Sequence, residues 1–462
     1  MNTMLRRLLM PVGALVLVLL LAASAMLAEL WFLLKPAPGE WSHAVRIGRV
    51  ELAVSVPGLL RMATHPMAAP LIDGRSLGSP LGRWQWRAGT GQPLRGRCAP
   101  CRIHIAALGA QPLELAQARI EARREGAQGM RGTLWLGEGD DTLTLPWSAK
   151  LSAQGAQLVL TLDEVPAARM VRVFGTAMPE VAHVRIEGRV ALKARARFGV
   201  GVAPLGAWQI EPRLEGLVVS GLGTERLAGA EAPAACRTVR SAAAMEGWLP
   251  RAVVAAEDQR FYEHPGYDLT ELMAAFQRNQ DRLSPGDPTL APHGASTITQ
   301  QLAKLLVTGS DRSAARKLRE LLYAVEMERT LGKGRILQLY LALAPWGDGV
   351  CGAARAAEAH LGRSVDTLGP VASAWLASLL TNPQRQLQAL AAGAEPDRQR
   401  LRRILEDMRP MHRLQREKAL EQLASWQPPM QRPGLIVAPK RVPLPQLVMP
   451  IAPAQLASAP LH

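Results

Sequence analysis

Cysteine is scarce in this chain, and its scarcity limits the sites that the chain can build. Four cysteines occur among 462 residues, and Cys98 and Cys101 form a CxxC pair without a second such pair. Paired CxxC motifs are the usual sign of a zinc site, so we predict no metal centre. In an oxidising compartment Cys98 could bond to Cys101, which would leave Cys236 to pair with Cys351. Four cysteines allow three connectivities, and all three stay open at this point.

Acidic residues are also in deficit. The chain has 39 acidic and 54 basic residues, which gives a net charge of +15. A basic protein attracts anionic partners, which could be nucleic acid, a phospholipid surface or a phosphorylated substrate. A chain of this length is too long for one compact core, so we expect two or three domains.

Charge is absent from Leu8 to Ala28, directly after two arginines. A helix of this length crosses about 30 Å of hydrocarbon, and Trp31 and Phe32 stand where interface anchors are common. We therefore predict that residues 1–35 form a cytoplasmic N-terminus and a transmembrane anchor.

A cleavable signal peptide is the rival interpretation. The sequence "ASA" at Ala23 to Ala25 resembles a cleavage site, although the apolar run is longer than a usual signal-peptide core. In both cases the rest of the chain is exported, which excludes nucleic acid as a partner.

Residues 41–229 alternate with period two, which predicts a β-rich domain of unknown role. The segment from Val184 to Phe198 reads as one long half-buried strand with a basic outer face, and Gly137 to Asp141 reads as a hairpin turn. The basic face could attract anionic lipid or glycan, or it could be an ordinary solvated strand face. No catalytic cluster is evident in this domain.

Helical periodicity follows after residue 236. In "LPRAVVAAEDQRFYEHPG" we predict a helix between Pro250 and Pro265, with Glu257 on an apolar stripe. The apolar residues of that stripe are Val253, Val254 and Phe261. The carboxylate could be an ordinary helix-end residue that reaches water. Alternatively it faces a cleft, where poor solvation raises its pKa and suits it to general acid or base catalysis.

The segment "GASTITQQLAKLL" has the spacing of a helix start. Thr297 and Gln300 fit a capping box. A helix N-terminus behind Gly294 is also a potential anion site, with Lys304 two turns further on. The later "RKLRE", residues 316–320, adds a basic pair followed by Glu, a pattern that is usually a solvated surface. Each signal is weak alone.

In this order, however, the motifs are specific. "EDQRFYEHPG", "GASTITQQ", "RKLRE", "KGRILQLYL" and "GVCGAARAA" resemble the peptidoglycan glycosyltransferase domain of class A penicillin-binding proteins and monofunctional biosynthetic transglycosylases. The similarity covers Arg237 to Pro383, about a third of the chain. The SxxK and KTG motifs of a penicillin-reactive domain are absent downstream, so the monofunctional type is the closer match.

The β-rich region and the helical region together predict an α+β multidomain protein, and the resemblance implies that residues 237–383 form a mainly α, lysozyme-like glycosyltransferase domain. A helical extension follows at 384–427, in which we expect one amphipathic helix from Asp397 to Trp426 that packs back on the catalytic domain. Its apolar face holds Leu401, Ile404, Leu405 and Met408. The Pro/Ala-rich segment 428–462 is expected to have little fixed structure.

The resemblance also implies a reaction. Such a domain joins lipid II units on the periplasmic side of a bacterial inner membrane: the acceptor 4-hydroxyl attacks the anomeric carbon of the lipid-linked glycan strand and displaces undecaprenyl pyrophosphate with inversion. The implied partners are lipid II, the growing strand, the inner membrane and other cell-wall synthesis proteins. A divalent cation such as Mg²⁺ could assist at the pyrophosphate, although the sequence has no dedicated cage for it.

Residue roles follow from the matching motif positions. Glu257 matches the catalytic base, and Glu320 matches a second acidic residue that orients the basic pair or the donor sugar. Lys304, Arg316 and Lys317 match positions that hold the pyrophosphate. The remaining residues expected to bind substrate are Asp258, His264, Ser296, Thr297, Gln300 and Gln301.

The chain also departs from the family pattern. Gln338 and Ala342 stand where the family usually has Glu and Asn, Cys351 is inserted in the fifth motif, and the loop from Asp281 to His293 is long and rich in proline. Two other functions stay open. Paired carboxylates could hydrolyse glycan, although hydrolysis has no pyrophosphate for the basic residues to hold. The chain could also be a non-catalytic scaffold that binds lipid II or cell-wall enzymes.

Overall fold

The structure is a computed structural model, and the residues it describes are 20–21, 24–25, 28, 31–32, 34–47, 50–63, 72–79, 82–89, 92–103, 113–126, 128–175, 178, 180, 183–202, 206–238, 245, 247–283, 294–309, 314–347 and 349–429. Within these ranges, no helix combines the length and the apolar character that a membrane span requires. The predicted anchor, Leu8 to Ala28, lies largely outside them, and so does the tail 430–462.

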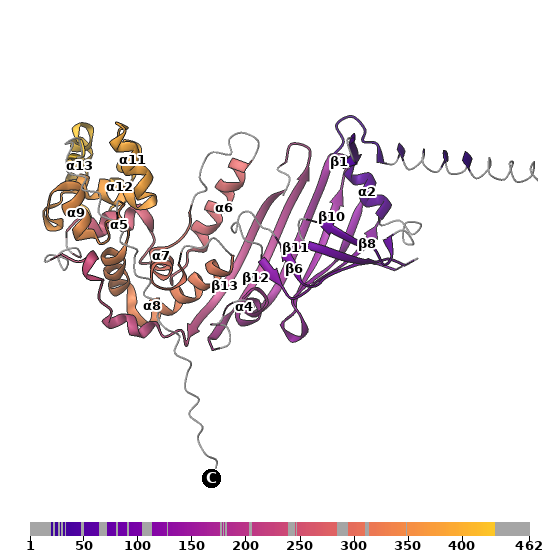
Figure 1. Ribbon diagram of the computed structural model, residues 1–462, viewed down its shortest axis with the longest axis horizontal. Helices are drawn as coiled ribbons and strands as arrows, with labels where there is room; N and C mark the ends of the chain where they lie inside the picture. Colours follow the sequence, from indigo (N-terminus) through magenta and orange to yellow (C-terminus); the bar gives the residue numbers. More distant parts are fainter. Residues whose placement is uncertain are drawn as a thin grey trace, which may run out of the picture.

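The first half of the chain is an antiparallel β-structure (Figure 1). Its main sheet has nine strands in the order β13-β12-β11-β10-β9-β8-β5-β4-β3, and β1-β2 and β6-β7 form separate pairs. The strands are β1 (Ser42–Ile47), β2 (Val50–Ser55), β3 (Ser76–Ser79), β4 (Gly82–Arg87), β5 (Leu94–Cys98), β6 (Cys101–Ile103), β7 (Leu113–Leu115), β8 (Ala118–Glu125), β9 (Gly129–Leu136), β10 (Leu143–Leu151), β11 (Gly155–Pro166), β12 (Arg185–Gly199) and β13 (Ala207–Ser220).

Strand β12 confirms the period-two prediction. Ala194 and Ala196 are buried, while Arg195 and Arg197 between them are exposed. This alternation follows because successive side chains of a strand point to opposite faces. Part of the outer positive charge is paired across strands, as between Arg195 and Glu211 on β13 at 2.6 Å. The predicted hairpin is also present, since β9 and β10 pair on either side of a short turn at Gly139–Asp141.

In the described part of this half, two short α-helices accompany the sheet. Helix α2 (Val56–Ala63) follows β2, and α4 (Ala167–Phe174) connects β11 to β12. Val173 of α4 packs in a core with Leu143, Leu145 and Leu162 from the central strands. The sheet therefore buries one face while its arginine-bearing face stays in solvent.

The second half of the chain is helical (Figure 1). Its helices are α5 (Leu249–Glu257), α6 (Leu269–Leu283), α7 (Ile298–Ala303), α8 (Ala314–Leu343), α9 (Ala353–Leu361), α10 (Pro370–Ser378), α11 (Pro383–Ala391), α12 (Arg398–Asp407) and α13 (Arg413–Ser425). Helix α8 is interrupted at Gly332, whose φ of 70° is a left-handed conformation that glycine adopts readily.

One hydrophobic core joins most of the helices of this half, from α5 to α13, although α6 adds no residue to it. It includes the fully buried Trp346 and Trp375. It extends to Leu227, before the predicted start of the domain at residue 237, and to Leu405 and Leu423, after its predicted end at residue 383. The C-terminal segment therefore packs back on the helical domain, and the core is not divided at Pro383.

The single C-terminal helix predicted from Asp397 to Trp426 is wrong. The structure has two helices, α12 and α13, with a break around Arg409 and Pro410. Proline lacks the backbone N–H that a helix needs, and it also disfavours a helical conformation in the residue before it. The amphipathic pattern continues across the break because both helices bury a face in the same core.

The two halves meet along β13. Helices α6 and α8 pack against this edge strand, as Figure 1 shows. The side chain of Gln280 on α6 donates to the carbonyl of Trp208 at 2.6 Å and accepts from its N–H, so it satisfies backbone groups of the sheet edge. Glu326 on α8 accepts from the Leu222 amide and the Thr224 hydroxyl, both at 2.9 Å. The Gln280 contacts cover part of an edge strand that would otherwise be open to pairing.

Both cysteine pairs considered from the sequence are bonded in the structure. Cys98 is bonded to Cys101, and Cys236 is bonded to Cys351, 115 residues away along the chain. The second disulfide connects the entry of the helical domain to the turn that precedes α9. It therefore ties together two segments that carry parts of the same core.

Candidate active site

Glu257 is the last residue of α5. Pro250 lies in the first turn of this helix, as predicted, but the helix does not continue to Pro265. Asp258 has φ −162° and ψ 74°, which ends the helix, and Phe261 lies in the following turns, where it is fully buried. The prediction of a helix up to Pro265 is therefore wrong, because the side chain of Asp258 makes a contact outside the helix.

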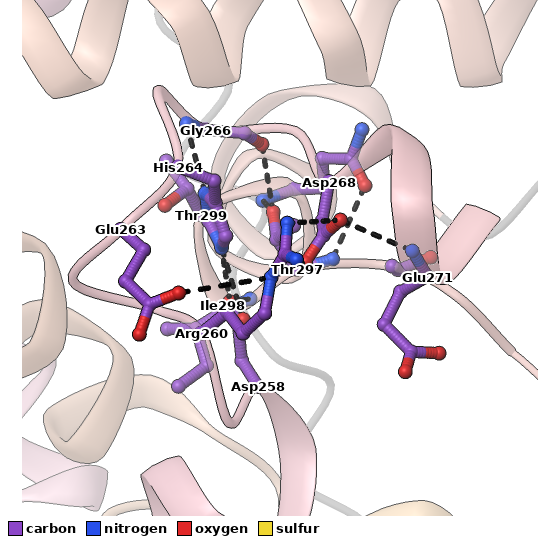
Figure 2. A network of polar contacts seen from close by, with 12 residues as sticks. Asp258, Arg260, Glu263, His264, Gly266, Asp268, Glu271, Thr297, Ile298 and Thr299 are labelled. Atoms are coloured by element: carbon purple, nitrogen blue, oxygen red, sulfur yellow. Dashed lines mark hydrogen bonds and ion pairs between the residues drawn. The ribbon is translucent and has the colours of Figure 1, made fainter.

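That contact joins α5 to α7. Asp258 accepts from the Ile298 amide at 2.9 Å and contacts His264 Nε2 at 2.9 Å (Figure 2). The Gly266 amide donates to His264 Nδ1 at 3.1 Å, so the ring proton lies on Nε2 and is donated to Asp258. The side chains of His264 and Asp258 are 2% and 5% exposed. The structure thus places these two predicted substrate-binding residues inside the scaffold.

Three backbone amides at the start of α7, those of Thr297, Ile298 and Gln300, donate to protein groups. Thr297 is the N-cap, and its hydroxyl accepts from the Gln300 amide while the Gln300 side chain accepts from the Thr297 amide. The Thr297 hydroxyl also donates to the Gly266 carbonyl at 2.8 Å. Together with the Ile298 contact to Asp258, these bonds confirm the predicted capping box at the start of α7.

Gln301, one residue further along α7, contacts the Glu257 carboxylate. Its Nε2 donates to Glu257 Oε2 at 3.0 Å, and its Oε1 accepts from the Tyr340 hydroxyl at 2.8 Å. Because Tyr340 can only donate here when protonated, and burial raises its pKa well above the ordinary value, the tyrosine fixes the orientation of the amide.

Burial raises the pKa of Glu257 above its ordinary value, and the hydrogen bond from Gln301 and the charge of Arg400 oppose this rise. The Glu257 side chain is only 10% exposed. This degree of burial excludes the interpretation of a helix-end carboxylate that simply reaches water. A poorly solvated carboxylate with an elevated pKa is suited to accept a proton from a substrate.

Two further side chains near Glu257 were not predicted. The Thr381 hydroxyl lies 3.4 Å and Arg400 Nη2 lies 3.6 Å from Glu257 Oε1. Tyr340 was also missed, although it lies within the motif "KGRILQLYL". Thr381 and Arg400 lie outside the five motifs, so the sequence carried no signal for them.

A cluster of basic residues lies at the start of α8. Lys317 Nζ donates to Ser296 Oγ and to Glu320 Oε2, both at 2.7 Å, and Arg316 also pairs with Glu320. Burial, together with the charges of Arg316 and Lys304, lowers the pKa of Lys317 to about 8. Glu320 is 1% exposed and lies between its cationic partners, so it holds them in place.

The carboxylate and the cations belong to one connected set of contacts. Gln301 Nε2, which donates to Glu257, also lies 3.5 Å from the Ser296 carbonyl, and the Ser296 hydroxyl contacts Lys317. Gln301 and Ser296 therefore connect the proton acceptor, Glu257, to the basic cluster on α8. This arrangement can remove a proton from a nucleophile and stabilise an anionic leaving group.

One departure from the family pattern, Gln338, takes no part in these contacts. Gln338 is exposed, and its Oε1 accepts from Arg335 at 2.6 Å. The predicted loop from Asp281 to His293 lies largely outside the described residues. In the part of the chain that the structure describes, no group of three or more His, Cys, Asp or Glu residues is placed to hold a metal ion.

Comparison with known proteins agrees with this site. Residues 227–409 match the family model described as Transglycosylase. The biosynthetic peptidoglycan transglycosylase of Nitrosomonas eutropha is 42% identical over 138 residues, which is 29% of this chain and 53% of the relative. The protein of the same name from Bordetella avium is 43% identical over 136 residues, 29% of this chain and 56% of the relative. That from Azoarcus sp. is 40% identical over 157 residues, 33% and 65% respectively.

Residues 227–409 of the helical half are therefore similar to the transglycosylase family. The relatives are named biosynthetic peptidoglycan transglycosylases, and the chain spans between 53% and 65% of the length of the three described above. The family match extends to residue 409, beyond the predicted boundary at Pro383, and so includes α11 and α12.

Proposed function

We propose that this chain is a monofunctional peptidoglycan glycosyltransferase that polymerises glycan strands from lipid II and releases undecaprenyl pyrophosphate. The observation that carries the proposal is the buried Glu257 carboxylate, connected through Gln301 and Ser296 to the basic cluster on α8. The names of the relatives support the same activity.

In the proposed reaction, Glu257 accepts the proton of the acceptor 4-hydroxyl as its oxygen bonds to the anomeric carbon of the donor. The bond between that carbon and the pyrophosphate oxygen breaks with inversion. Lys304, Arg316 and Lys317 stabilise the negative charge that develops on the departing pyrophosphate. Glu320 keeps Arg316 and Lys317 directed toward it.

In this proposal Asp258 and His264 act on the reaction indirectly, through the position of Glu257. They connect the end of α5 to the start of α7 and so fix Glu257 relative to Gln301. Thr297 and Gln300 cap α7 and maintain the same geometry. Ser296 and Gln301 are the residues of this segment to which we assign contact with the substrate. We also propose that the domain works on the outer side of a bacterial inner membrane, where its lipid-linked substrate is presented.

The test is incubation of the purified full chain with labelled lipid II and analysis of the products. The proposal predicts long glycan strands and released undecaprenyl pyrophosphate. Cleavage of preformed glycan without polymer would instead identify a hydrolase. Saturable binding of lipid II without turnover would identify a scaffold.

A further inference from the structure

The C-terminal segment brings an arginine to the proposed catalytic carboxylate. Asp397 caps α12 by accepting from the backbone amide of Arg400 at 2.9 Å, which places Arg400 in the first turn of the helix. From there its Nη2 reaches to 3.6 Å from Glu257 Oε1 and also donates to the Thr381 hydroxyl. The charge therefore comes from an element more than a hundred residues away from Glu257 in sequence.

The placement of α12 does not depend on the arginine side chain. Leu401 and Leu405 are 1% and 0% exposed in the core. Asp407 at the end of α12 accepts from Gln259 at 2.6 Å, so α12 is also bound directly to the segment that follows Glu257. Because the cap uses the backbone amide of residue 400, a substitution there keeps the bond to Asp397.

The contacts of Glu257 are unequal at its two oxygens. Oε2 accepts a hydrogen bond from Gln301 at 3.0 Å, whereas Oε1 has longer contacts with Thr381 at 3.4 Å and Arg400 at 3.6 Å. Oε1 is thus the oxygen with capacity for a short hydrogen bond from a substrate hydroxyl. Arg400 faces that oxygen.

Among the residues that the structure describes, two charged side chains, Asp258 and Arg400, act on Glu257. Asp258, its neighbour, opposes ionisation, and Arg400 favours it. Helix α10, which packs against α5, has no ionisable residue, and α12 supplies Arg400. Tyr340 of α8 also acts on the site, where burial keeps it neutral. Arg400 is therefore the positive charge that offsets both the burial of the carboxylate and the nearby Asp258.

We propose that Arg400 is a positioning residue of the active site, which holds Glu257 through Oε1 and keeps it in its basic, ionised form. This inference rests on the proposed function. It makes the C-terminal helix α12 a part of the active site rather than only a support for the core.

The test compares Arg400→Gln and Arg400→Lys with the matched control Arg402→Gln, an exposed arginine on the same helix. Polymerisation of lipid II by each full chain is measured as a function of pH. We expect the acid limb of the Arg400→Gln profile to move to higher pH, with a rate about tenfold or more below wild type at mildly acidic pH. The deficit should shrink as the pH approaches 8. Arg400→Lys should keep most of the activity, and Arg402→Gln should match wild type.

A second readout does not need activity. Infrared difference spectra between each protein and its Glu257→Gln counterpart follow the protonated carboxyl of residue 257, and in Arg400→Gln this band should persist to higher pH than in wild type. The proposal is wrong if the carboxyl band of residue 257 titrates at the same pH in wild type and in Arg400→Gln. It is also wrong if both Arg400 variants lose rate by the same factor at every pH, which indicates a structural role. A wild-type chain that fails to polymerise contradicts the proposed function, while the infrared titration still decides the role of Arg400.

Discussion

Lys317 carries a charge that alkaline pH removes. Burial and the neighbouring cations Arg316 and Lys304 lower its pKa to about 8, despite the contact with Glu320. If this charge helps to stabilise the pyrophosphate, the rate of polymerisation should fall as the pH rises through about 8. Lys317→Arg should keep its charge and extend the active range upward, because a guanidinium stays protonated. The measurement is the rate as a function of pH for both proteins.

The stability of the fold should rise, not fall, as the pH increases above about 8. A lowered lysine pKa means that the folded protein binds this proton less tightly than the unfolded chain does. Protonated Lys317 therefore costs stability below about pH 8, and this cost is relieved as the pH rises from there toward the ordinary lysine value of 10.5. Loss of activity without loss of stability over this range would separate the catalytic effect from unfolding. An alkaline limb that is identical in Lys317→Arg would contradict the assigned role.

At the same scale, the sequence found some site residues and missed others for physical reasons. Glu257 and Gln301 were candidates because they stand in specific motifs, and the structure places them in contact. Arg400 and Thr381 reach the same carboxylate from segments with no recognisable motif. Their roles depend on how helices far apart in the sequence pack together. The order of residues within a short segment does not encode that packing.

The Cys236–Cys351 disulfide makes a prediction at the scale of elements. It closes a loop with a sequence separation of 115, so in the chain-entropy model it stabilises the fold by on the order of 3 to 5 kcal/mol. The double variant Cys236→Ala, Cys351→Ala should unfold at markedly lower denaturant concentration. The matched control is Cys98→Ala, Cys101→Ala, which opens a loop with a separation of only 3 and should cost less. Equal midpoints for wild type and the first variant would refute this expectation.

Element boundaries were predictable only where local chemistry controls them. The strand β12 and the capping box at Thr297 were found from the sequence, since alternation and N-cap chemistry are local signals. The end of α5 was not, because Asp258 leaves the helix to bind the amide of Ile298, 40 residues away. The break at Pro410 was overlooked although proline signals it locally, because the apolar pattern continues on both sides.

At the scale of the whole molecule, the sequence indicated a β-rich half followed by a helical half, but not how they join. The strand order of the main sheet and the packing of α6 and α8 on β13 result from long-range pairing. Glu326 illustrates the difficulty. In sequence it is one acidic residue of a helix, yet in the structure it is buried and binds backbone and side chain near Thr224, about a hundred residues earlier.

The N-terminal residues predict an orientation for the chain relative to a membrane. Two arginines precede the apolar run, and little positive charge follows it, so we predict that the chain beyond Lys35 lies outside the cytoplasm. Alkaline phosphatase, which is active only after export, should be active when fused after Trp41, and a cytoplasm-dependent reporter at the same point should be inactive. The reverse pattern would contradict both the predicted anchor and the use of an exported lipid-linked substrate.

The central claim is that Glu257 is the base of a glycan polymerase, and one comparison tests it most directly. Purified wild type and Glu257→Gln are measured for lipid II turnover and melting temperature together, with Glu263→Gln, whose side chain is 71% exposed in the turns after α5, as the matched control. The glutamine keeps the size of the side chain but cannot accept a proton. Turnover should therefore fall by about 10²-fold or more, or about 2.7 kcal/mol of barrier.

The melting temperature of Glu257→Gln should stay the same or rise at neutral pH. Burial raises the pKa of Glu257, so its ionised form costs stability above the ordinary glutamate value, and the neutral amide removes that cost. Glu263→Gln should match wild type in both measurements. The account predicts lost turnover with an intact fold in Glu257→Gln; equal turnover in wild type and Glu257→Gln, or lost turnover together with a collapsed melting temperature, would contradict it.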